Sequence, residues 1–207
     1  MSKRFSFSAM GAALVLGALV AGCINLGGGT QRLPRLYVLE ALASDTDRLA
    51  AVRAASMTIG VGPLVFPDYL DRPQLVTRAG DNEIIAAPFA HWAEPLKQNT
   101  IRALVENLAT IADSGGVYRY PWWAEYAPQF QLQMEIDRYD AMRNGEAVLS
   151  VSWEWLDQDG KPLMARERSI LQQPVEGDSD EAVVAAMSRL LLTFSRLVAT
   201  QLAAFPI

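Results

Sequence analysis

The 207-residue chain contains a single cysteine and a single histidine, and this scarcity limits the chemistry that it can perform. With one cysteine it can form no internal disulfide, so a buried core must supply its stability. One cysteine and one histidine are too few for the usual zinc sites. The chain also lacks the glycine-rich loop that holds phosphates and the glycine pattern that surrounds a nucleophilic serine. We therefore expect no metal site, and we expect that the protein is not an enzyme.

The few groups that could support catalysis have simpler interpretations. His91 precedes a predicted helix, and we interpret it as a residue at the surface or at the start of that helix. Glu135 and Asp137 share one face of a predicted strand, which is typical of a solvated strand face. The alternative, a hydrolase, would require His91, an acid and a serine to meet in one pocket.

Basic residues are few as well. The chain has 18 lysines and arginines against 23 acidic residues, a formal net charge of −5. Without residues 1–22 it keeps 16 basic and 23 acidic residues, and the net charge becomes −7. An acidic chain with no basic run is a poor ligand for polyanions, so we expect no binding of nucleic acid.

What the chain does contain, at its start, is a short basic segment and an apolar run that ends at its only cysteine. Lys3 and Arg4 are followed by apolar residues and glycines up to the sequence Val-Ala-Gly-Cys that ends at Cys23. This layout predicts a secretory signal peptide over residues 1–22. The apolar run of about 12 residues is shorter than the roughly 20 that span a bilayer. An ordinary secreted protein would leave Cys23 unpaired in an oxidising compartment.

The end of this segment resembles the lipobox of bacterial lipoproteins. That resemblance implies cleavage between Gly22 and Cys23, and acyl chains such as palmitate on Cys23, with no other cofactor. Ile24 is not the aspartate that commonly retains lipoproteins at the inner membrane, which implies the outer membrane, on its periplasmic face. Residues 23–32, with three consecutive glycines, predict a flexible tether, and eight such residues reach roughly 15 Å.

Residues 33–207 predict a single domain. The hydrophobic periodicity predicts strands near residues 36–39, 56–61, 74–78 and 83–86, a helix over 93–112, strands over 129–139, 147–156 and 163–171, and a helix over 179–203. Asp178 is the expected N-cap of the last helix. The expected fold class is α+β, with a mostly antiparallel sheet covered by two long amphipathic helices in the order β-β-β-β-α-β-β-β-α.

Three further blocks carry a resemblance to a known family. They run from Pro67 to Arg78, from His91 to Leu96 and from Val117 to Trp122. Together with the lipobox and the early Tyr-Val-Leu, they resemble the ABC-type transport auxiliary lipoproteins of the paraquat-inducible protein C family, over nearly all of the mature chain. One difference is His91, where members of that family usually carry arginine.

The resemblance implies a protein without enzymatic activity. Such lipoproteins sit at the outer membrane and work with periplasmic proteins of the mammalian-cell-entry (MCE) type, which are linked to an inner-membrane ABC transporter. The system moves lipids or other hydrophobic molecules between the membranes and supports membrane integrity. The lipoprotein would dock the outer-membrane end of the conduit as a homo-oligomer. Two alternatives remain: a carrier that itself holds acyl chains between helices and sheet, and a purely structural lipoprotein.

Within the three blocks and directly after the last of them, five residues are candidates for partner binding: Tyr69, Leu70, Arg72, Trp92 and Trp123. The first three could instead close a rigid corner in which Arg72 pairs with Asp68 or Asp71, and Trp92 could pack at the base of the first long helix. Successive residues of an extended segment point to opposite faces, and we expect Trp123, rather than its neighbour, to face outward. Trp153 and Trp155 share a strand face and are expected in the core.

Overall fold

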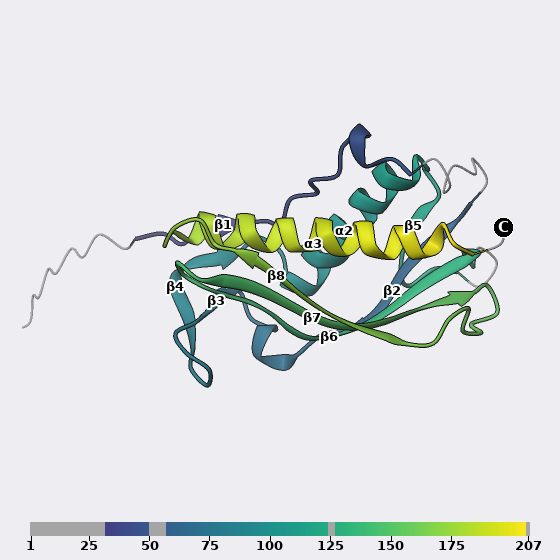
Figure 1. The fold of residues 1–207 in the computed structure, drawn as a ribbon. Helices are drawn as coiled ribbons and strands as arrows, with labels where there is room; N and C mark the ends of the chain where they lie inside the picture. The colour runs from purple at the N-terminus through teal and green to yellow at the C-terminus, as the bar shows by residue number, and fades with distance from the viewer. Residues whose placement is uncertain (1–31, 50–56, 124–126, 206–207) are drawn as a thin grey trace, which may run out of the picture. The chain divides into compact units, whose positions relative to one another are not determined.

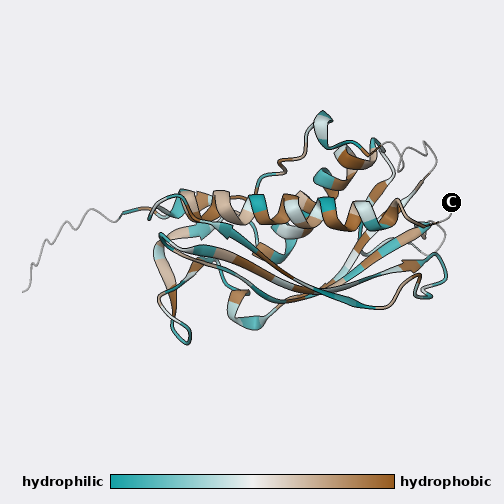
Figure 2. Cartoon of the chain, in the orientation of Figure 1, coloured by the Kyte–Doolittle hydropathy of each residue, from teal (hydrophilic) through white to brown (hydrophobic). Residues whose placement is uncertain are grey.

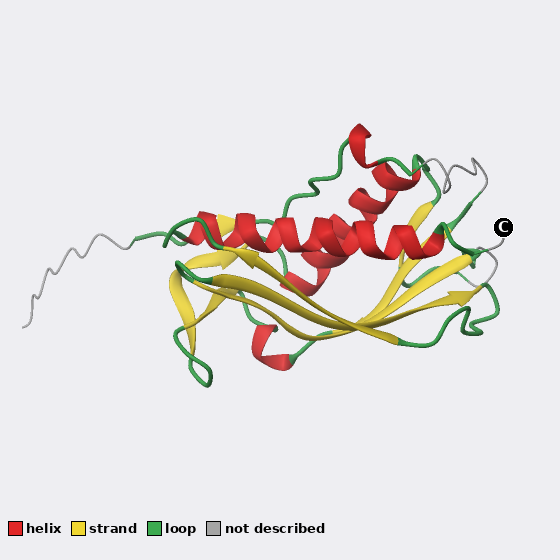
Figure 3. Ribbon diagram, in the orientation of Figure 1, coloured by secondary structure: helices red, strands yellow, loops and turns green. Residues whose placement is uncertain are grey.

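In the computed structural model, residues 32–49, 57–123 and 127–205 are described, and Pro34–Ile207 form one compact unit. The signal peptide, Gly22, Cys23 and the tether residues up to 31 lie outside the described residues. The described part contains eight strands in one sheet: β1 (Arg35–Tyr37), β2 (Ile59–Val65), β3 (Gln74–Arg78), β4 (Ile84–Trp92), β5 (Val117–Arg119), β6 (Phe130–Met142), β7 (Glu146–Asp157) and β8 (Glu167–Pro174). The helices are α2 (Leu96–Ala112) and α3 (Asp180–Leu202), with short 3-10 turns η2 (Asp45–Asp47) and η4 (Asp68–Leu70). Figure 3 shows their arrangement.

Strand β6 is the centre of the sheet. One of its edges pairs antiparallel with β7, which in turn pairs antiparallel with β8. Its other edge is shared: β2 pairs with its first half and β3 with its last residues, both parallel. Strands β5 and β1 add further parallel pairings, to β2 and β4. The α+β class is confirmed, and the sheet is mixed, with its longest pairings antiparallel.

Both helices pack on one face of this sheet (Figure 1). Helix α3 runs antiparallel to β6, as two hydrogen bonds show. Tyr139 Oη, near the end of β6, donates to the Met187 carbonyl in the first half of the helix at 2.9 Å. Trp155 Nε1, whose residue pairs with the start of β6, donates to the Val198 carbonyl near the end of the helix at 3.2 Å. Trp153 and Trp155 are fully buried, so the predicted core pair is confirmed. Their indoles fill the interior at the centre of the sheet.

Helix α3 is also the one described helix that is long and apolar enough to cross a membrane. Its apolar stripe is buried against the sheet, however, and Figure 2 shows polar and apolar residues alternating around it. Its apolar character is therefore explained by the core of the folded unit.

Helix α2 holds the irregular segment between β1 and η2. Asn99 Oδ1 accepts from the Leu39 amide at 2.9 Å, and Asn107 Oδ1 accepts from the Ala43 amide at 2.9 Å. Arg102 Nη2 donates to the Leu39 carbonyl at 2.7 Å. These side chains replace the strand partners that the segment lacks, so its backbone polar groups are satisfied without further sheet.

The element boundaries differ from the expected ones in a few places. β2 continues through Pro63 because a register shift between Val61 and Leu64 takes up the proline, which has no amide hydrogen to donate. β5 was not expected from the sequence, so the order has one strand more than predicted. The N-cap of α3 is Ser179, whose Oγ accepts from the Ala182 amide at 3.1 Å; the expectation for Asp178 was wrong because that residue lies one position too early.

Candidate docking surface

The corner formed by η4 fills the gap that β2 and β3 leave on their shared edge of β6. Asp140 of β6 lies in this gap and is completely buried. Tyr69 Oη donates to its Oδ2 at 2.8 Å, and Arg78 Nε lies 3.0 Å from both of its carboxylate oxygens. Arg138 Nε donates to Oδ1 at 2.8 Å. The side chain of Tyr69 therefore contacts β6 in the gap between β2 and β3.

Burial and the neighbouring Asp140 carboxylate raise the pKa of Tyr69 to about 12, because both disfavour a phenolate at that position. Leu70 is buried in the core beside it. Tyr69 and Leu70 therefore make the contacts of a structural corner, and a role for them in partner binding stays a prediction. Asp140 was not recognised from the sequence. The available signal was an acidic residue directly between Tyr139 and Ala141, near the end of a predicted strand.

The structure brings Arg72 and Trp92 to one shallow hollow of ≈ 240 Å³ between η4 and the start of α2. Trp92 is buried and its amide donates to the Pro73 carbonyl at 2.7 Å, so only its rim reaches the hollow. Among the described residues Arg72 forms no ion pair with Asp68 or Asp71. The pairing suggested for the corner is therefore wrong, and backbone hydrogen bonds hold the corner instead.

His91 and the carboxylates of Glu135 and Asp137 all lie on strands of the sheet. His91 is a half-buried residue of β4 opposite Gln74, and so it belongs to a strand rather than to a helix start. Asp137 pairs with Arg168 at the surface, with a separation of 3.2 Å. Glu135 pairs with Arg166 in the same way. These two ion pairs fit the interpretation of Glu135 and Asp137 as residues of a solvated strand face.

The outer face of β2 carries an aromatic segment. A Cβ atom added at Gly60 would lie 2.6 Å from Trp122 Cζ3 and 2.5 Å from Pro128 Cγ. One added at Gly62 would lie 2.7 Å from Tyr120 Cβ, and Gly62 has a positive φ of 115°. Only glycine gives the Tyr120 and Trp122 side chains room to lie this close to the strand. The two glycines were not recognised from the sequence, although alternation with buried Ile59 and Val61 was the visible signal.

We call residues 118–123 the aromatic end. Tyr120 and Trp122 meet edge to face with ring centroids 5.3 Å apart, which fixes the base of the segment. Trp123 projects from this base with 78% of its surface exposed, whereas Trp122 is half-buried; the prediction that Trp123 faces outward is confirmed. Beside it lies a hollow of ≈ 570 Å³, lined by Thr58, Tyr118, Arg119, Pro121, Trp122, Trp123 and Ala127.

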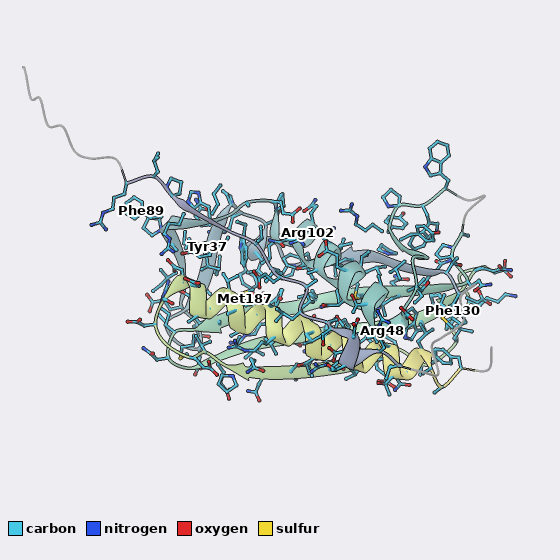
Figure 4. All side chains as sticks on the ribbon, turned by 90° about the horizontal axis from the view of Figure 1, so that it is seen from above. Tyr37, Arg48, Phe89, Arg102, Phe130 and Met187 are labelled. Atoms are coloured by element: carbon cyan, nitrogen blue, oxygen red, sulfur yellow. The ribbon has the colours of Figure 1, made fainter. Side chains whose placement is uncertain are left out.

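The aromatic end lies at the opposite end of the sheet from β1, where the chain enters the folded unit (Figure 1). Near β1, the Glu40 amide donates to Ser188 Oγ in the first half of α3. The other end of the sheet lies below the last turns of α3, which spans about 35 Å at 1.5 Å per residue. In Figure 4, Phe89 and Phe130 mark these two ends.

Exposed tryptophan and tyrosine on a rigid base are typical of protein contacts. They bury large areas and lose little side-chain entropy on binding. Among the described residues that line the hollow, Arg119 is the only charged one, and the other lining residues are mostly aromatic or apolar.

Comparison with known proteins identifies a related family. The sequence model of the ABC-type transport auxiliary lipoprotein component matches residues 37–199. No curated protein matches the chain. Among solved structures, protein XCC0632 from Xanthomonas campestris is 16% identical with a TM-score of 0.68, covering 82% of this chain and 94% of its own. An uncharacterized protein is 19% identical with a TM-score of 0.65, covering 82% of this chain and 99% of its own. These two likenesses concern the fold alone.

Proposed function

The chain belongs to the family of ABC-type transport auxiliary lipoproteins, and from that membership we propose how it works within such a system. As a member it is an auxiliary component of an ABC transport system and a membrane-anchored protein of the cell envelope. The finer proposal is a non-catalytic adaptor at the outer membrane. It docks an MCE-type periplasmic protein, as a homo-oligomer, in a system that carries lipids or other hydrophobic molecules between the membranes and supports membrane integrity.

The observation that carries this proposal is the aromatic end. Trp123 is exposed on a base that Gly60 and Gly62 make possible, so the chain holds a large apolar group in solvent at a rigid position. Exposed apolar side chains gathered in one patch, here Tyr118, Tyr120 and Trp123, are typical of a surface that a partner covers. The aromatic end also lies far from β1, so it can face the periplasm while the tether holds the other end near the membrane.

The anchor in this proposal is Cys23, acylated after cleavage behind Gly22. Each buried methylene contributes about 0.8 kcal/mol, and stable attachment takes about two acyl chains, or one chain and another signal. Changing Cys23→Ala is expected to prevent acylation and to leave an uncleaved or soluble form. Recovery of that variant with the outer membrane fraction would contradict the anchor.

An independent carrier that holds acyl chains in its own interior is the less favoured alternative. The space between the helices and the sheet is filled by Tyr139, Trp153, Trp155, Met187 and Phe194, all essentially buried. The hollows described above open at the surface instead. Lipid that co-purifies in stoichiometric amounts, without any partner protein, would favour the carrier.

The test is an affinity pull-down of the mature, detergent-extracted protein from its own envelope, with mass spectrometry of the recovered proteins and lipids. We expect an MCE-type protein with the wild type and a loss of it with Trp123→Ala. Truncating a central interface residue typically costs about 2 kcal/mol or more, roughly a thirtyfold loss of affinity.

The matched control is Ile170→Ala, which removes another largely exposed apolar side chain, on β8. It should leave recovery unchanged. Equal recovery with both variants would exclude the aromatic end as the docking surface, and the absence of any MCE-type protein would contradict the adaptor proposal itself.

A further inference from the structure

A second group of exposed apolar side chains lies at the end of the sheet where the chain enters the folded unit. They come from β1, from the residue that follows it, and from β4: Leu36, Val38, Ile84, Ile85 and Phe89. We call these five residues the apolar edge. In Figure 4, Phe89 and Tyr37 are both labelled at this end of the sheet.

The apolar edge projects from the body of the sheet. β1 pairs only with Ala90–Trp92, so the earlier part of β4 has β3 on one side and no strand on the other. Ile84 and Ile85 are consecutive and point to opposite faces, yet both are exposed. Apolar side chains on both faces of a projecting hairpin indicate that an apolar environment receives them.

Addition of another strand is not a good explanation for this edge. Pro88 lies within β4 and Pro34 immediately precedes β1. Neither has an amide hydrogen, and prolines in edge strands block pairing with another chain. The occupant must therefore accept apolar side chains without forming hydrogen bonds to the backbone of the edge. The interfacial region of a bilayer meets this requirement.

The position along the chain fits a bilayer. About twelve residues separate Cys23 from Arg35, and a flexible glycine-containing segment of that length reaches roughly 20 Å. An acyl anchor on Cys23 would thus keep the apolar edge constantly near the membrane surface. The aromatic end lies a further helix length away.

The charges around the apolar edge are acidic rather than basic, with two arginines against four carboxylates. Leu36 and Val38 line a hollow of ≈ 570 Å³ against α3, with Arg35 and Arg189 on its lining together with Glu40 and Glu181. The tip of the β3–β4 hairpin carries two exposed acids, Asp81 and Glu83. Contact with a bilayer would therefore depend on apolar burial and would gain nothing from attraction to anionic lipid.

We propose that the apolar edge rests in the surface of the same bilayer that holds the acyl anchor, as a second attachment that orients the aromatic end toward the periplasm. The proposal rests on the acylation of Cys23 proposed above. It adds a defined orientation to what would otherwise be a domain on a loose tether.

The test uses the full mature, acylated chain with Ala86→Cys, an exposed position between Ile85 and Ala87. A fluorophore sensitive to polarity is attached to the new thiol, and the protein is placed in vesicles of phosphatidylethanolamine and phosphatidylglycerol. We expect emission shifted to the blue and quenching by brominated lipid. Adding Leu36→Ser and Phe89→Ser should abolish both signals while the chain stays vesicle-bound.

The matched control is the same label at Lys161→Cys, an exposed turn position near the start of β6. It should show neither signal. Equal signals at both positions, or none at position 86, would overturn the proposal. Blue emission from the Cys23→Ala form without vesicles, rising with protein concentration, would also overturn it by assigning the edge to a second copy. Intact mass reports acylation separately, so a failed anchor is distinguishable from a failed orientation.

Discussion

Asp140→Asn is the substitution that most directly tests how the sheet is closed. Four contacts reach this carboxylate, and all come from donors: Tyr69 Oη, Arg138 Nε, and Arg78 Nε to each oxygen. An asparagine keeps the shape, so no cavity forms. Its amide nitrogen, however, replaces an acceptor by a donor that faces these donors, and it removes the buried negative charge.

The magnitude follows from burial. The Asp140 side chain is fully buried and that of Arg78 is only 18% exposed, so the substitution leaves a largely buried guanidinium without its counter-charge. Breaking such a pair by removing one partner typically costs about 3–5 kcal/mol. With an m-value of about 2 kcal/mol per molar urea, the unfolding midpoint should fall by roughly 1.5–2.5 M.

Asp137→Asn provides the matched control on the same strand. Asp137 also pairs with an arginine, Arg168, but their side chains are 42% and 62% exposed. Exposed pairs contribute about 0–1 kcal/mol, so its midpoint should change little. Both variants are measured by urea unfolding in the Cys23→Ala background, with circular dichroism and tryptophan fluorescence. Similar midpoints for the two variants would refute the reasoning.

Three further outcomes are expected. Gly60→Ala should lower the free energy of unfolding by about 1–3 kcal/mol, because its Cβ would overlap Trp122 and Pro128. Gly80→Ala should leave the free energy of unfolding unchanged, because no atom lies near its Cβ. The denaturant midpoints of the two variants test this difference. The pKa of Tyr69 is about 12, above the usual value of 10, so its share of stability is complete below about pH 10 and is lost as the pH rises toward 12. Tyr69→Phe should make stability fall less steeply over that window, and an unchanged slope would argue against it. Ser179→Ala removes the N-cap of α3 and should cost about 0.5–2 kcal/mol, measured by thermal unfolding, with Ser179→Asp restoring most of the loss.

Local signals in the sequence predicted the elements that local chemistry determines. The strands predicted over 129–139, 147–156 and 163–171 pair as two consecutive hairpins. Asn144 has a positive φ of 53° and Gly160 one of 78°, which is the conformation that the tight turns between them require. The periodicity of the two long helices likewise predicted their buried faces. These features depend on residues close together in the chain.

The features that were missed depend on partners far along the chain. β5 has only three residues, and its strand conformation is explained by pairing with β2, about sixty residues earlier. Asp140 is acceptable in the interior only because Tyr69 and Arg78 approach from another part of the chain. The room that Gly60 leaves for Trp122 is similarly a contact between distant segments. The hydrophobic periodicity of a sequence does not predict contacts between segments so far apart in the chain.

The sharing of one edge of β6 by β2 and β3 has a consequence for folding kinetics. β2 precedes its β6 partner residues by about seventy positions, and loop closure over such distances is slow. A chain that emerges from a membrane channel with its N-terminus first therefore exposes β2, β3 and β5 before the strand that completes their sheet has appeared. Until residues 130–142 follow, β2 and β3 lack the strand that joins them into one sheet. If the chain is exported as proposed above, we expect it to depend on chaperones for longer than a protein of similar size built from consecutive hairpins.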